Sequence, residues 1–133
     1  MYDYAWYPGM NANDPGACVF ASTSRATPVH LWDAVTGSVR ASYVAHDHLD
    51  EPTAALSVAF SSDGTKLLAG YKNCVRSWDL SRPGRTCDVY RTLEKKRGRG
   101  EYGVDGRSGQ VGLVSCIATS PATGGLFACG SYG

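Results

Sequence analysis

Short apolar runs recur along the chain in a fixed order. Each run is four to six residues long, and glycine, proline, aspartate or serine separates it from the next. These are the lengths and spacers of β-strands joined by tight turns. One run has the pattern Val-x-x-Trp-Asp, at residues 29–33 and again at 75–79, so that the two Trp-Asp pairs are 46 residues apart. The pattern predicts a repeating all-β fold and does not favour helices.

Two other run types recur three times each and complete the repeat. They lie at residues 4–8, 58–62 and 117–121 for the first type, and at residues 19–22, 67–70 and 127–130 for the second. Aligned in this way, Val19 corresponds to Leu67 and Ser22 to Gly70. A 46-residue period of four strands, with Trp-Asp closing the third, is typical of a β-propeller blade. The chain resembles WD-repeat proteins, and we expect a fragment of a WD-repeat β-propeller with about two and a half four-stranded blades.

The repeats divide the chain into four segments. We expect a first blade with its exit loop at residues 1–52, a second blade at 53–93, a basic Gly-rich loop between blades at 94–110, and the first half of a third blade at 111–133. Because each blade buries its faces only against its neighbours, the chain is expected to be part of a larger ring. The residues expected to be structural anchors, because they recur at the same positions, are Trp32, Asp33, Trp78 and Asp79.

One feature of WD-repeat proteins is incomplete. Their blades often carry a hydrogen-bonded set of Trp, Asp, Ser or Thr, and His, with the Asp six residues before the Trp. Ala26 and Lys72 occupy those positions here. The resemblance therefore implies blades that depend more on packing than on this network.

Charge and cysteine content narrow the function classes. The formal net charge is only +1, which argues against a protein coated in nucleic acid, yet residues 82–107 carry eight basic and four acidic residues. The five cysteines are odd in number and form no C-x-x-C pair, so neither a disulfide framework nor a zinc site is predicted. No apolar run approaches the roughly 18 residues of a membrane span.

Several longer strings resemble one family of WD-repeat proteins. They are Tyr-Asp-Tyr-Ala-Trp-Tyr at 2–7, His-Leu-Asp-Glu at 48–51, Arg-Pro-Gly-Arg at 82–85 and Ala-Cys-Gly-Ser-Tyr-Gly at 128–133. These strings resemble the telomerase Cajal body protein family. The resemblance implies a nuclear, non-catalytic scaffold without cofactors that recognises the CAB box of H/ACA small Cajal body RNAs and telomerase RNA. It also implies protein partners in these ribonucleoproteins and delivery of the particles to Cajal bodies and telomeres. The alternative is a WD-repeat protein–protein scaffold that does not bind RNA directly.

The loops expected on one face of the propeller suggest where RNA would bind. Loops between blades and loops between the second and third strands emerge at the same end of the strands. A Lys/Arg cluster neutralises phosphates, and aromatic or Arg planes stack on unpaired bases. The candidate RNA-contacting residues on this face are Arg25, Tyr71, Lys72, Lys95, Lys96, Arg97 and Arg99. The basic loop can equally be a solvated linker, and Arg25 and Tyr71 ordinary surface residues.

Enzymatic interpretations are weak. Gly98, Gly100 and Gly103 match a dinucleotide-binding fingerprint, but that motif requires a βαβ unit, which the strand pattern excludes. His46, Asp47 and His48 lie close together in the sequence but have no third ligand or pocket residue to support metal or acid–base chemistry. We therefore expect no enzyme activity and no metal.

Overall fold

The computed structural model describes residues 2–25, 27–46, 52–95, 107–109, 112–121 and 126–132. Strands dominate these residues, and the only helical element among them is a 3₁₀ turn, η1, at Pro15–Ala17. The predicted all-β class is confirmed. No helix in this described part of the chain is both long and apolar enough to cross a membrane.

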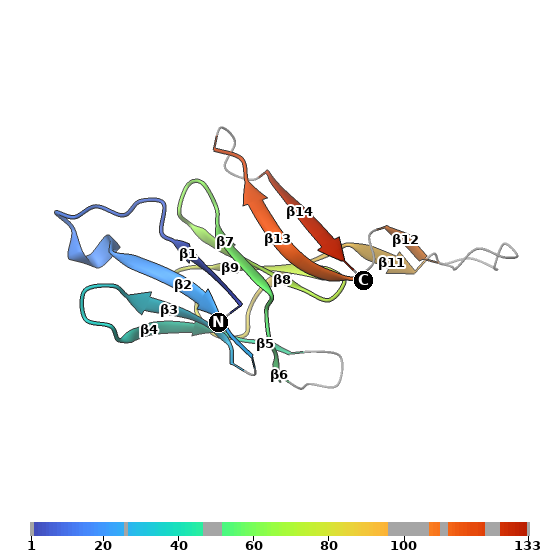
Figure 1. The fold of residues 1–133 in the computed structure, drawn as a ribbon, viewed down its shortest axis with the longest axis horizontal. Helices are drawn as coiled ribbons and strands as arrows, with labels where there is room; N and C mark the ends of the chain where they lie inside the picture. Colours follow the sequence, from blue (N-terminus) through green and yellow to red (C-terminus); the bar gives the residue numbers. More distant parts are fainter. Residues whose placement is uncertain are drawn as a thin grey trace, which may run out of the picture.

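Two four-stranded antiparallel sheets form the body of the molecule (Figure 1). We call them blade 1 and blade 2. The strands of blade 1, in spatial order, are β1 (Asp3–Trp6), β2 (Val19–Thr23), β3 (Val29–Asp33) and β4 (Val39–Tyr43). The strands of blade 2 are β7 (Ser57–Phe60), β8 (Lys66–Tyr71), β9 (Cys74–Asp79) and β10 (Asp88–Arg91). Each sheet follows the meander order expected of a propeller blade.

Three strand pairs complete the structure. The longest, β13 (Leu113–Thr119) with β14 (Phe127–Tyr132), packs beside blade 2 as the first half of a third blade. Two short hairpins lie in the connections: β5 (Ala45–His46) with β6 (Pro52–Thr53), and β11 (Leu93–Lys95) with β12 (Arg107–Gly109). Strand β7 contacts both β1 and β13, so the first strands of successive sheets lie side by side, as in a propeller.

The strand register corrects the sequence alignment of the repeats by one residue. Trp32 pairs with Phe20, whereas Trp78 pairs with Leu67, so Phe20 and Leu67 are equivalent. Ser22 therefore corresponds to Ala69 and not to Gly70. A one-residue slip exchanges the two faces of a strand, and small residues at neighbouring positions made the two alignments indistinguishable from sequence.

The main core lies between blades 1 and 2. Trp78 is fully buried there, with its ring 6.0 Å from that of Tyr43 and 6.3 Å from that of Tyr71. Asp3 links the two sheets, because its Oδ2 accepts a hydrogen bond from the Val58 amide at 3.0 Å. Trp78 thus joins rings from both blades in one core.

Trp32 holds the equivalent position in blade 1 but is only partly buried. It lies on the face of blade 1 that points away from blade 2, where none of the described sheets covers it. Its ring stacks on Phe20 at 6.4 Å, and Trp6 packs on Phe20 at 5.1 Å while remaining 52% exposed. The sequence indicated a core anchor, but in this chain Trp32 belongs to an open aromatic face.

Candidate nucleic-acid interface

The connections of the blades emerge at two opposite ends of the strands (Figure 1). One end holds the β2–β3 loop at residues 24–28, hairpin β5–β6, the β8–β9 turn at 72–73 and hairpin β11–β12; we call it the basic end. The other holds the β1–β2, β3–β4, β7–β8 and β9–β10 connections; we call it the aspartate end. This division follows from the antiparallel order of each sheet.

Carboxylates at the aspartate end are used to build turns. Asp33 Oδ1 accepts hydrogen bonds from the amides of Val35 and Thr36, and its Oδ2 accepts one from Arg40 Nε at 3.1 Å. These contacts hold the pKa of Asp33 below its usual range. Asp33 therefore shapes the β3–β4 turn.

Asp79 and Asp63 act in the same way at the β9–β10 and β7–β8 connections. The Asp79 carboxylate accepts hydrogen bonds from the amide and hydroxyl of Ser81, which lower its pKa. Asp63 Oδ1 accepts from the Ser61 hydroxyl at 2.6 Å and from Thr65, and its pKa falls to about 2. Asp33, Asp63 and Asp79 are thus tied to local backbone and hydroxyl groups.

The basic end carries the opposite balance of charge. Among the described residues, its acids are Asp3, which bonds the Val58 amide, and Glu94. The described cationic residues at this end are Arg25, Lys72, Arg76, Arg91, Lys95 and Arg107. Arg25 and Lys72 are exposed, in the β2–β3 loop and the β8–β9 turn. The structure therefore brings these two candidates to the same end as Lys95 in β11.

Three further candidates, Lys96, Arg97 and Arg99, lie outside the described residues. Within the basic stretch at 82–107, Arg82 lies elsewhere. It is at the start of the β9–β10 connection, at the aspartate end, where its amide donates to the Asp79 carbonyl oxygen at 2.9 Å. The same connection then reaches the end of β4, since Gly84 pairs with Tyr43. The charge count along the sequence therefore overstates the positive charge available to one surface.

Tyr71 is a correction to the candidate set. Its side chain is 3% exposed and lies in the core between the blades, beside Trp78. Burial raises the pKa of its phenol well above the usual value. Alternation along β8 puts Tyr71 on the same face as Leu67 and Ala69, so its ring is not available to stack on a base.

Arg76, which no sequence motif marked, lies above that buried ring. The guanidinium carbon is 5.5 Å from the Tyr71 ring centroid, within cation–π range. Nη2 donates to the His46 carbonyl oxygen at 2.7 Å, and Nη1 lies 3.7 Å from Cys87 Sγ. Buried Nε has no partner among the described residues. Arg76 thus ties β9 of blade 2 to hairpin β5–β6, and the strand pattern gave no sign of this long-range contact.

A second missed residue is Asn73, in the β8–β9 turn. It has a left-handed backbone conformation, with φ of 59°. Its backbone carbonyl accepts a hydrogen bond from Thr92, which precedes hairpin β11–β12. Its backbone amide and its side chain both bond Gly112, which follows the hairpin. Neither contact is visible in the sequence, because Asn73 and Gly112 are 39 residues apart.

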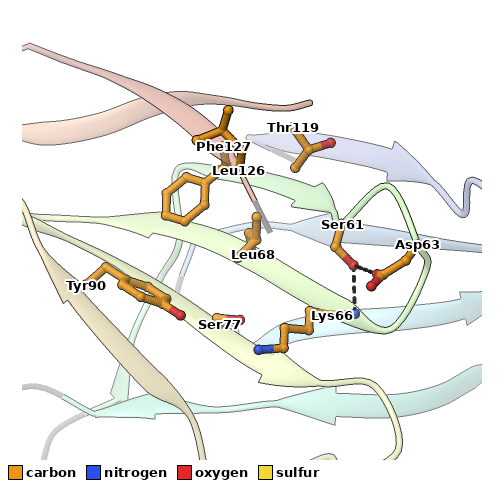
Figure 2. Close-up of a pocket in the computed structure, with 9 residues that line it drawn as sticks. All are labelled: Ser61, Asp63, Lys66, Leu68, Ser77, Tyr90, Thr119, Leu126 and Phe127. Atoms are coloured by element: carbon orange, nitrogen blue, oxygen red, sulfur yellow. Dashed lines mark hydrogen bonds between the residues drawn. The ribbon is translucent and has the colours of Figure 1, made fainter. Parts of the chain in front are cut away.

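A pocket lies between blade 2 and the β13–β14 pair (Figure 2). Its volume is about 160 Å³, and Tyr90 and Phe127 meet edge to face at one side, with ring centroids 5.6 Å apart. Ser61, Asp63 and Lys66 line the other side, where Asp63 is already bonded in its turn. None of the candidate RNA-contacting residues lines this pocket. In the described parts of the chain, no three His, Cys, Asp or Glu residues group as a metal site.

Comparison with known proteins identifies relatives of the whole chain. No protein-family model matches it. The chain is 48% identical over 133 residues to "Telomerase Cajal body protein 1" of Homo sapiens, and 39% identical over 132 residues to "Telomerase Cajal body protein 1 homolog" of Drosophila melanogaster. The chain is homologous to the telomerase Cajal body proteins. The resemblance found in the sequence strings is thereby confirmed.

A third relative carries a different name, and all three are much longer than this chain. "Guanine nucleotide-binding protein negative regulator 1" of Schizosaccharomyces pombe is 31% identical over 134 residues. The chain spans 22% of the human relative, 21% of the Drosophila relative and 32% of the S. pombe relative. The homology therefore covers one part of each of these proteins.

Proposed function

We propose that this chain is part of a non-catalytic RNA-binding scaffold of the telomerase Cajal body protein type. Its RNA ligands would be CAB-box H/ACA small Cajal body RNAs and telomerase RNA, and it would direct these particles to Cajal bodies and telomeres in the nucleus. Homology with proteins of that name supports the telomerase and Cajal body association. The observation that carries RNA binding is the gathering of cationic residues at one end of the blades.

The chemistry of the basic end suits a phosphate backbone. Each phosphate that a cation neutralises releases counterions, and this supplies most of the sequence-independent affinity for RNA. Recognition of the CAB box would need contacts with unstacked bases as well. With Tyr71 buried, exposed Arg25 is the remaining candidate for stacking on a base. Lys72 and Lys95 would act on phosphates.

The test compares two double variants of the complete protein that remove the same charge from opposite ends. Arg25→Gln with Lys72→Gln changes the basic end. Lys66→Gln with Arg82→Gln changes exposed residues of the aspartate end and is the matched control. We expect the first variant to lose affinity for a CAB-box loop RNA and the control to bind like wild type. Equal affinities for both variants, or no binding by wild type, would contradict the proposal.

The alternative function, a protein–protein scaffold, has one observation in its favour. The S. pombe relative is named as a regulator of a guanine nucleotide-binding protein, not for an RNA. Under this alternative, purification of the complete protein recovers protein partners but no enriched RNA. Sequencing the RNA that is crosslinked to the complete protein in cells separates the two functions.

A further inference from the structure

We propose that Asn73 is a positioning residue that fixes hairpin β11–β12 at the basic end, so that the hairpin is in place before RNA binds. The role in RNA binding rests on the function proposed above. The attachment of the hairpin to blade 2 is independent of that function and can be tested separately.

Asn73 holds both ends of the segment that contains the hairpin. Its carbonyl oxygen accepts a hydrogen bond from the Thr92 amide at 2.9 Å, directly before β11. Its amide donates to the Gly112 carbonyl oxygen, and its Oδ1 accepts from the Gly112 amide, both at 2.8 Å. One residue of the β8–β9 turn thus closes the segment at both sides.

The conformation of Asn73 explains why an asparagine suits this position. Its φ is 59°, and among the described residues no other non-glycine residue has a positive φ. Asparagine tolerates this region better than most residues, and its short amide can bond to nearby backbone. Glycine would accept the same backbone conformation but would offer no Oδ1 to Gly112.

The strand that follows the hairpin is held to blade 2 as well. An isolated bridge pairs Lys72 with Leu113, and Ser57 Oγ donates to the Val114 carbonyl oxygen at 2.9 Å. Gly70 makes this approach possible, because a Cβ there would lie 2.5 Å from the Val114 carbonyl oxygen. The exit of the hairpin is therefore anchored over three consecutive residues, from Gly112 to Val114.

The register of the hairpin gives this attachment a consequence for ligand binding. Lys95 pairs directly with Arg107, so two basic residues occupy one cross-strand position. A hairpin without support from Asn73 would have to be ordered when RNA binds, at a cost in conformational entropy.

Two variants of the complete protein test the proposal. Asn73→Gly keeps the left-handed conformation accessible and removes the Oδ1 acceptor. Asn73→Asp keeps an acceptor oxygen at this position, and aspartate also tolerates a positive φ. Hydrogen exchange of the Gly112 amide should accelerate in Asn73→Gly and stay near the wild-type rate in Asn73→Asp.

RNA affinity is then measured for both variants over a range of salt concentrations. Asn73→Gly should bind a CAB-box loop RNA roughly 2- to 10-fold more weakly at every salt concentration, the range for one net hydrogen bond. Asn73→Asp should show a deficit only at low salt, because its added charge is screened as salt rises. A role confined to fold stability would change the melting temperature but not this affinity.

Each result supports or overturns a named part of the proposal. Unchanged exchange at Gly112 in Asn73→Gly would overturn the attachment. Faster exchange with wild-type affinity would show that Asn73 supports the fold and not RNA binding, which overturns the positioning role. If the wild-type protein binds no RNA, the proposed function fails and the positioning role with it, while the exchange result still decides whether Asn73 holds the hairpin.

Discussion

The two repeated tryptophans have different polar partners. Trp32 Nε1 donates to Ser22 Oγ at 2.8 Å. In blade 2 the equivalent of Ser22 is Ala69, and buried Trp78 Nε1 has no partner among the described residues. A buried N–H without an acceptor is a cost to the folded state. Blade 1 thus keeps one bond of the usual WD-repeat network, while blade 2 has lost it.

A serine at position 69 should restore the missing acceptor. We expect Ala69→Ser to raise the free energy of unfolding by about 1 kcal/mol, the net worth of a typical hydrogen bond, because the hydroxyl would face Trp78 Nε1. Ser22→Ala is the reciprocal variant and should lower it by a similar amount. Thermal melting of the complete protein measures both. A lower melting temperature for Ala69→Ser would mean that the core has no room for the hydroxyl.

Individual residues were the least predictable level. The sequence placed Tyr71 on the surface because it precedes a turn, but the register of β8 turns its ring into the core. Arg76 and Asn73 were missed because their partners, His46 and Gly112, are distant in the sequence. Side-chain contacts with remote backbone leave no local pattern, so only the assembled sheets reveal them.

At the level of elements, each end of the blades uses a different turn chemistry. Aspartates with neighbouring serine or threonine close the β3–β4, β7–β8 and β9–β10 connections. The connections of the basic end contain no such aspartate turn among the described residues, and Asn73 takes that place in the β8–β9 turn. Among the described residues, turn formation thus concentrates aspartates at one end of the blades.

These aspartate turns predict how stability depends on pH. The folded-state pKa of Asp63, about 2, lies below the ordinary value of 3.8, so the unfolded chain binds a proton first as pH falls. The stabilisation is complete above about pH 4 and is lost as pH falls towards 2. Asp63→Asn should therefore lose less stability than wild type over this interval in thermal melts. Equal losses would mean that other carboxyl groups dominate acid unfolding.

Strand existence was predictable, whereas strand register was not. Runs of four to six apolar residues between glycine, proline and aspartate located the first three strands of both blades and the β13–β14 pair. The register of β8 was misassigned by one residue, because Leu67 and Leu68 are both buried, on opposite faces of the strand. Blade 2 packs on both sides, so its apolar residues do not alternate with polar ones.

For the whole molecule, the open face of blade 1 shows how the repeat extends. Tyr4 and Trp6 are 58% and 52% exposed, while their equivalents in blade 2, Val58 and Phe60, are covered by blade 1. The same positions are therefore exposed in blade 1 and buried in blade 2, where blade 1 precedes them. The homologous proteins extend far beyond the matched stretch, and we expect the complete protein to cover this face with another blade.

The basic segment at residues 94–110 predicts a salt dependence of RNA binding in the assembled protein. If Lys95, Lys96, Arg97 and Arg99 contact phosphates, replacing all four with glutamine should flatten the slope of log affinity against log salt by roughly 0.7 per lost contact on single-stranded RNA. Affinity should fall alike for a CAB-box loop and a scrambled loop, because phosphate contacts position the nucleic acid while base contacts specify it. Salt titrations of the complete wild-type and variant proteins against both RNAs measure these effects. An unchanged slope would make residues 94–110 a solvated linker, and a loss of discrimination between the two RNAs would instead mean that these residues contact bases.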